Sequence, residues 1–180
     1  MPLKQILYSL PPLLTAMLLA GLAVAALAHG SRAKGNRLFA LFCFLGSLLY
    51  VDILIAFNAP TPRLALVTSR AAHLLHPFLI PLFIHFFHLF LNIGRRRWLV
   101  RCAYVYAAMT SACAPWGWII ADVRRFDFGY FGQAGPLFFL TAVGAAAATV
   151  YNATLLYRAI AAEERAIQKN KLKYVFIGFG

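Results

Sequence analysis

Ser69 to Ile93, SRAAHLLHPFLIPLFIHFFHLFLNI, is the stretch on which the interpretation of the whole chain depends. It is apolar and longer than the roughly 20 residues that a membrane-spanning helix needs. It holds four of the five histidines, and Arg70 lies near its start. It ends against Gly94 and the arginines 95–97, as is typical of a membrane helix that reaches the cytoplasmic surface.

The composition points to the same class of protein. The 180 residues are 62% hydrophobic and 12% charged, whereas soluble domains are about half apolar and about a quarter charged. The net charge of +12 would suggest nucleic acid binding in a soluble chain, but here the cations lie in short loops between apolar segments, so we predict no nucleic acid partner. The three cysteines form no CxxC pair, which leaves no basis for a metal cluster or a disulfide framework.

The sequence predicts an all-α, polytopic membrane helix bundle that forms a single domain over residues 1–180. Five full membrane helices are expected, followed by the start of a sixth, with a charged linker at 158–173. The predicted helices span about 6–28, 38–57, 64–93, 98–120, 136–157 and, for the start of the sixth, 174–180. The last apolar run is too short to cross a bilayer, so we expect a chain cut inside the sixth helix, with a short interfacial tail as the alternative.

The distribution of cations predicts the topology. Twelve Lys and Arg residues follow the first, third and fifth helices, and four lie on the other side. The twelve are Arg32, Lys34, Arg37, Arg95, Arg96, Arg97, Arg101, Arg158, Arg165, Lys169, Lys171 and Lys173; the four are Lys4, Arg63, Arg124 and Arg125. Cytoplasmic loops carry the excess of cations, so we predict an outside N-terminus and a multi-pass protein of the inner (plasma) membrane.

The histidines form two pairs with helical spacing. His73 and His76 share one helix face, as do His85 and His88. His76 and His85 lie on opposite faces, whereas His73 and His88 lie about 60° apart around the helix and roughly four turns apart along it. Structural hydrogen bonding, a polar ligand pocket or proton-sensitive element, and haem or metal ligation are all compatible with this pattern. No cofactor is predicted, and His85 with His88 remains the alternative metal-ligating pair.

Asp52 and Arg70 are the other ionisable groups expected inside the bilayer. Such groups are costly there and usually face the bundle interior with a partner. Both lie at similar depth on helices joined by a short loop, so we predict an Asp52–Arg70 pair, either as a structural contact or as part of a ligand site.

Prolines predict a kink in one helix, and small residues predict a close-packing face on another. Pro77 and Pro81 are expected to kink the third helix, because each removes a backbone hydrogen bond. Gly144 and Ala148 provide a small-xxx-small spacing for close helix packing, within the chain or in a homodimer.

Three motifs resemble the N-terminal seven-helix sensor region of bacterial membrane histidine kinases, which is also found ahead of diguanylate cyclases. They are FDFGYFGQAGPLFFL (126–140), PFLIPLFIHFFHLFL (77–91) with Arg70 before it, and QKNKLKYVFIGFG (168–180). The resemblance covers essentially the whole chain. It implies a seven-helix sensor with an outside N-terminus that drives a cytoplasmic output domain or response regulator, as in a two-component system.

We therefore predict a non-catalytic sensory input module in the lipid bilayer. No GxSxG, phosphate-binding loop or HExxH motif is present, so kinase activity would need a further C-terminal domain. The ligand is expected to be a small or lipid-like molecule, and the candidate contacts are Asp52, Arg70, His73, His76, Arg124, Arg125 and Gln133. The alternative is a small transporter, or a redox subunit that uses the His-rich helix for protons, quinone or haem.

Overall fold

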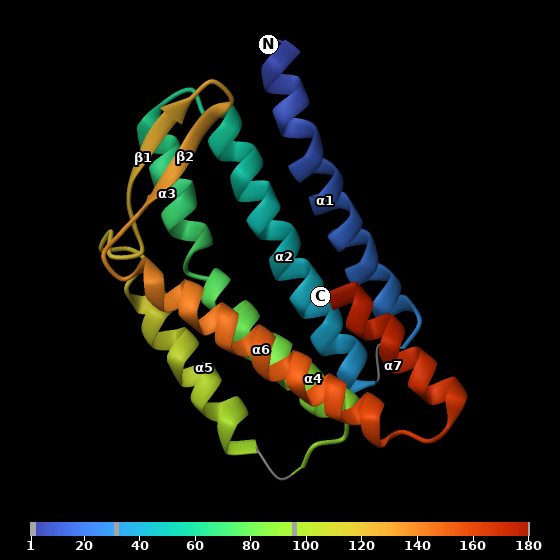
Figure 1. Ribbon diagram of the computed structural model, residues 1–180. Helices are drawn as coiled ribbons and strands as arrows, with labels where there is room; N and C mark the ends of the chain where they lie inside the picture. The colour runs from blue at the N-terminus through green and yellow to red at the C-terminus, as the bar shows by residue number, and fades with distance from the viewer. Residues whose placement is uncertain (1–2, 31–32, 95–96, 180) are drawn as a thin grey trace.

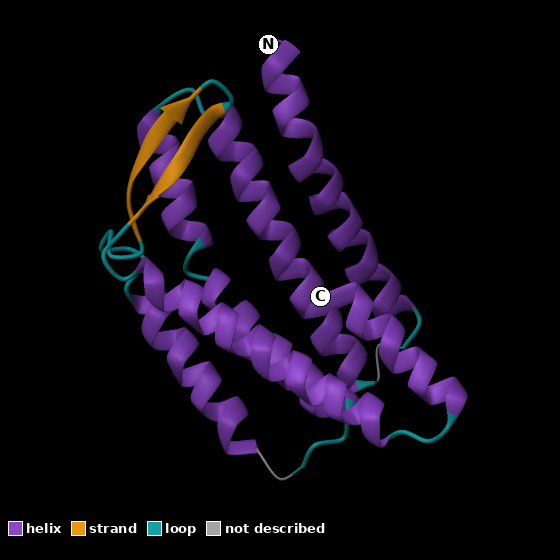
Figure 2. Ribbon diagram, viewed as in Figure 1, coloured by secondary structure: helices purple, strands orange, loops and turns teal. Residues whose placement is uncertain are grey.

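The computed structural model describes residues 3–30, 33–94 and 97–179, and 76% of the chain is helical (Figure 1). Most helices pack side by side, and a β-hairpin covers one end (Figure 2). The elements are α1 (Leu3–Ala28), α2 (Lys34–Asn58), α3 (Pro62–Ala72), the 3-10 turn η1 (His76–Phe78), α4 (Leu79–Phe90), α5 (Arg97–Ala112), β1 (Ile120–Phe126), β2 (Gly129–Ala134), α6 (Phe138–Ala162) and α7 (Ala166–Phe179).

Among the described residues, four helical stretches are long and apolar enough to cross a membrane: Lys4–Ala28, Lys34–Asn58, Pro62–Phe90 and Phe138–Ala162. A helix of 25 residues is about 37 Å long, which exceeds the hydrocarbon thickness of about 30 Å. Large apolar side chains such as Leu7, Met17 and Val24 are exposed along α1, as suits a lipid-facing surface. The length and apolar character of these four segments are compatible with the predicted membrane protein.

α1 and α2 form an antiparallel pair in which small side chains allow close approach (Figure 1). Ala23, Ala40 and Cys43 make the buried centre of their contact. The Ser47 hydroxyl donates a hydrogen bond to the carbonyl of Ala16 at 2.9 Å. Hydrogen bonds between helices replace those that water would make in a soluble protein.

The predicted third helix, 64–93, is interrupted rather than merely kinked. α3 ends at Ala72, η1 covers His76–Phe78, and α4 begins at Leu79. Pro77 has no N–H to continue the α3 ladder, whereas Pro81 lies in the first turn of α4, where its missing N–H has no cost. The Ser111 hydroxyl of α5 donates to the freed carbonyl of Leu74 at 2.5 Å, so a neighbouring helix satisfies the interruption.

The all-α prediction is wrong at residues 120–134, where β1 and β2 pair antiparallel with Phe126 opposite Gly129. The predicted fourth helix, 98–120, also ends early, at Ala112. Pro115 follows it, and Gly117 has φ +78°, which a helix cannot accommodate. Alternation of aromatic and small residues around a two-residue turn then favours the hairpin.

The buried centre of the bundle surrounds α4. Ile80 and Ile84 pack against Val100 of α5 and Ala148 of α6. At Gly144, a Cβ atom would lie 2.8 Å from the Tyr106 ring and 3.0 Å from the Ile80 side chain. The small-xxx-small face of α6 is therefore used for packing inside the chain.

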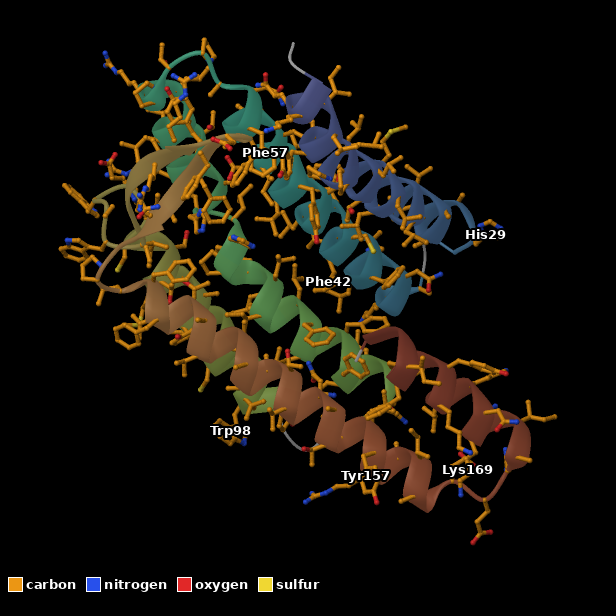
Figure 3. The ribbon with its side chains drawn as sticks, turned by 45° about the horizontal axis from the view of Figure 1, so that its top comes forward. His29, Phe42, Phe57, Trp98, Tyr157 and Lys169 are labelled. Carbon is orange, nitrogen blue, oxygen red and sulfur yellow. The ribbon has the colours of Figure 1, made fainter. Side chains whose placement is uncertain are left out.

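The predicted linker at 158–173 is mostly helical. α6 continues to Ala162, and α7 begins at Ala166, before the predicted sixth helix at 174. In the break between them, the Glu163 carboxylate accepts a hydrogen bond from the Arg165 backbone N–H at 3.0 Å. Lys169 of α7 and Tyr157 of α6 are labelled on these two helices in Figure 3.

Candidate functional site

The hairpin lies against α2 and α3, and aromatic rings fix its tip. We call this the hairpin end of the bundle, which also holds the start of α1 and the end of α2. The Phe128 ring lies 5.0 Å from that of Phe57 (labelled in Figure 3) and 5.4 Å from that of Tyr8. Gly129 has φ +133°, and a Cβ there would strike the backbone of Phe57. The turn therefore requires glycine for both conformation and space.

The predicted Asp52–Arg70 ion pair is wrong. Arg70 Nε donates to the carbonyl of Ile120 at 3.1 Å, and Nη2 donates to that of Ala121 at 2.8 Å. The prediction rested on the similar depth expected for the two residues. The backbone carbonyls at the start of β1 instead accept the hydrogen bonds of the Arg70 guanidinium. Arg70 thus joins α3 to the hairpin.

Asp52 instead belongs to a chain of polar groups at the interruption of the third segment. The buried Ser69 hydroxyl donates to Asp52 Oδ1 at 3.5 Å, a long contact. His73 Nδ1 lies 2.7 Å from the Ser69 carbonyl. The rings of His73 and His76 are 5.0 Å apart, so the shared face predicted for this pair is confirmed.

A mainly apolar groove of about 310 Å³ runs beside these groups. α2 supplies Asp52 and leucines, α3 supplies Thr68, and the interruption supplies His76. The buried His76 Nδ1 has no hydrogen-bond partner among the described residues. A carboxyl, a hydroxyl and an unpaired imidazole nitrogen in an apolar wall are the features of a small-molecule site.

The hairpin candidates do not reach this groove. Arg124 lies over the Phe126 ring at 5.5 Å, and Arg125 lies over the Tyr130 ring at 5.9 Å. Gln133 stands opposite Asp122 in the strand register. None of the three lines the groove, so the structure brings together Asp52 and His76 but not the candidate residues of the hairpin.

The second histidine pair lies at the opposite end of the bundle. We call this the basic end, where α2 and α5 begin and α4 ends. His85 Nδ1 lies 3.3 Å from the Tyr104 hydroxyl, and His88 Nε2 lies 2.8 Å from that of Tyr151. Within 3–30, 33–94 and 97–179, no three His, Cys, Asp or Glu side chains gather as metal ligands.

A second cavity, of about 780 Å³, opens at the basic end. Its lining combines the predicted loop cations Lys34, Arg37, Arg97 and Arg101 with His85, His88 and Tyr104. Arg32, Arg95 and Arg96 lie outside the described residues. The charge count placed these cations on one side of a membrane, but it did not predict a cavity among them.

The sequence analysis did not select several polar residues that are buried or hydrogen-bonded in the structure. Ser69 and Ser111 each follow a threonine in a mainly apolar segment, and each makes a hydrogen bond near the interruption, Ser69 to Asp52 and Ser111 to the Leu74 carbonyl. Asn152 of α6 is 1% exposed, and neither its side-chain nitrogen nor its oxygen has a partner among the described residues. Polar side chains within an apolar helix are the one pattern that could have indicated them.

Comparison with known proteins identifies no relative: no protein-family model, curated protein or solved structure matches this chain.

Proposed function

We propose that this chain is the sensory input module of a bacterial signal-transduction protein in the plasma membrane. The observation that carries the proposal is the convergence of Asp52, Ser69, His73 and His76 where the third segment is interrupted, beside the groove. Polar groups are costly at bilayer depth and are usually retained for function. An interrupted helix also supplies two pieces that can change their relative orientation.

The proposed orientation follows from the cation bias, twelve against four. The N-terminus and the hairpin end face outside, and the basic end faces the cytoplasm. α5 has only 16 residues. In the proposed topology it crosses the membrane together with the turns that follow it, as the fourth span in chain order. A signal received near the hairpin end then leaves through α6 and α7 towards a cytoplasmic output domain or response regulator.

The groove favours a small amphiphilic ligand with one polar head. Its walls are mainly leucine, isoleucine and valine, and its polar groups are Asp52, Thr68 and His76. Thr68 already donates to the carbonyls of Leu64 and Ala65, so its hydroxyl has only acceptor capacity left. Asp52 favours a cationic or hydrogen-donating head, and the apolar walls favour a short hydrocarbon tail.

Signalling would be a shift between two helix arrangements. A ligand that contacts both α2 and the turn at His76 holds these elements together. It moves the equilibrium only by the difference between its affinities for the two arrangements. The resemblance to histidine-kinase sensor regions agrees with this mode of action.

Hydrogen–deuterium exchange of the purified chain tests the proposal, with octylamine as the probe and octanol as its uncharged counterpart. We expect octylamine to slow exchange across His73–Leu79 and to alter exchange at the α6–α7 break. Asp52→Asn should abolish both effects, while Asp127→Asn, the same charge change in the hairpin turn, should retain them. Protection of the groove without any change at the α6–α7 break would contradict signalling.

A transporter or redox subunit is the second candidate, because each histidine at the basic end contacts a tyrosine hydroxyl. Such pairs can relay protons. Proton flux in proteoliposomes that is lost with His85→Gln would favour transport over sensing. A visible absorption band in the purified protein would favour the haem version.

A further inference from the structure

The cavity at the basic end has an unusual balance of charge. Four cationic side chains line it: Lys34 and Arg37 from α2, and Arg97 and Arg101 from α5. No carboxylate is among the lining residues. The two helices thus present their cations to one shared space of about 780 Å³.

No acidic group is available to neutralise these cations. The whole chain contains five acidic residues. Asp52 lines the groove, Asp122 and Asp127 belong to the hairpin, and Glu163 and Glu164 lie in the α6–α7 break. Among the described residues, none of the four cations forms an ion pair or a side-chain hydrogen bond. Like charges around one cavity repel, and a bound anion would relieve that repulsion.

Further groups around the cavity suit an anion. His85 and Tyr104 contact each other at 3.3 Å, which uses one of their two donor hydrogens and leaves the other for a ligand, and the Asn92 amide offers further donors. Among the described residues, no side chain caps the N-terminus of α2, so backbone N–H groups remain there beside Lys34. Arginine in particular matches the geometry of phosphate oxygens with two parallel hydrogen bonds.

The cavity also has an apolar side. Leu38 and Leu41 of α2 and Val100 of α5 complete its wall. Leu41 lies seven residues beyond Lys34, which is about 10 Å deeper along the helix. Trp98, which is labelled in Figure 3, follows Arg97 in the chain and is 62% exposed; tryptophan is enriched at membrane interfaces. Lys34 and Arg97 begin their helices, Arg37 and Arg101 lie about one turn further along beside Leu38 and Val100, and Leu41 lies beyond them, so the α2 wall changes from cationic to apolar along the helix.

We propose that this cavity binds the phosphate headgroup of an anionic phospholipid, with its first acyl carbons against Leu38, Leu41 and Val100. Basic pockets between membrane helices bind acidic lipid headgroups elsewhere. The inference is independent of the groove at the interruption, since the two cavities share no lining residue. A bound lipid would join α2 to α5 across the end of α4.

The test uses the full chain in a neutral detergent and native mass spectrometry with dioleoylphosphatidylglycerol as the probe. Dioleoylphosphatidylcholine is the comparison with no net charge, and inorganic phosphate is the soluble comparison. Arg37→Gln/Arg101→Gln should weaken phosphatidylglycerol binding at least roughly tenfold, because each cation near the headgroup contributes about 1 kcal/mol. Lys171→Gln/Lys173→Gln removes the same charge from exposed positions of α7 and should leave binding unchanged.

Three results would overturn the proposal. Equal loss in the two double variants would mean diffuse attraction to cations. Equal binding of phosphatidylcholine and phosphatidylglycerol by the wild type would remove the anion site, and this result needs no variant to fold. Displacement of the lipid by millimolar inorganic phosphate, bound equally well, would assign the cavity to a soluble phosphate compound. Arg37→Lys/Arg101→Lys should restore part of the affinity, since charge returns without the paired geometry.

Discussion

Replacing Arg70 with glutamine should increase the population in which the β-hairpin is detached from the helices, without unfolding the bundle. The guanidinium donates to the carbonyls of Ile120 and Ala121, at 3.1 and 2.8 Å. These two bonds join α3 to the first residues of β1. The aromatic contacts at the hairpin tip do not involve Arg70, so they remain in the variant.

The magnitude follows from the burial of the two bonds. A hydrogen bond from a charged donor contributes about 1.5–3 kcal/mol when it is protected from water. The bond to Ile120 is partly buried and the bond to Ala121 is exposed, so about 2 kcal/mol for both is a reasonable sum. That value corresponds to a roughly 30-fold larger population of the detached hairpin.

Tryptic cleavage in detergent measures this population, because the hairpin carries its own cleavage sites at Arg124 and Arg125. When opening is fast relative to cleavage, the cleavage rate follows the population of the open form. Arg63→Gln is the matched control, since Arg63 is an exposed residue of α3 and its loss also removes one charge and one tryptic site. An unchanged cleavage rate in Arg70→Gln, or an equal rise in the control, would refute the reasoning.

Three further substitutions test the packing. Gly144→Val should lower stability by about 1–3 kcal/mol through overpacking against neighbouring helices. The control Ala145→Val, on the exposed face, should not lower it. Equal melting temperatures of the two variants in detergent would disprove the close contact at Gly144. Ser111→Ala leaves a backbone carbonyl unpaired at the interruption and should lower stability by about 1–3 kcal/mol. The control Thr149→Ala removes only a hydrogen bond within its own helix. A smaller loss of thermal stability for Ser111→Ala than for Thr149→Ala would contradict the role of Ser111. Gly129→Ala should disrupt the hairpin turn through its positive φ and lack of space, and near-native resistance to trypsin would show otherwise.

Residue spacing correctly predicted features that depend on one helix alone. Pro77 removes a hydrogen-bond donor whatever surrounds it, and the interruption lies beside it. His73 and His76 face the same way because three residues make nearly one turn. The Asp52–Arg70 pair failed because depth is only one coordinate: the side chain of Arg70 had carbonyl acceptors nearby that belong to a segment 50 residues later.

The hairpin was missed for a related reason. Residues 120–134 are glycine-rich and aromatic, which indicates a turn, but strand pairing depends on the tight turn and on the helices that the strands cover. α5 is shorter than predicted because Pro115 and Gly117 stop it before its apolar run ends. Apolar length alone could not distinguish a continuing helix from a buried turn.

The sequence by itself determined that the chain has apolar helices long enough to cross a membrane, prolines that disturb its third segment, and a strong bias of cations between the ends of its helices. These properties follow from local composition, because the bilayer sets a helix length and proline removes a hydrogen bond wherever it stands. Only the tertiary structure decided which polar groups meet. The groove joins α2 to the interruption, and the basic cavity joins α2, α4 and α5. Both depend on the rotation of each helix about its axis, which packing between distant segments sets and no single segment encodes.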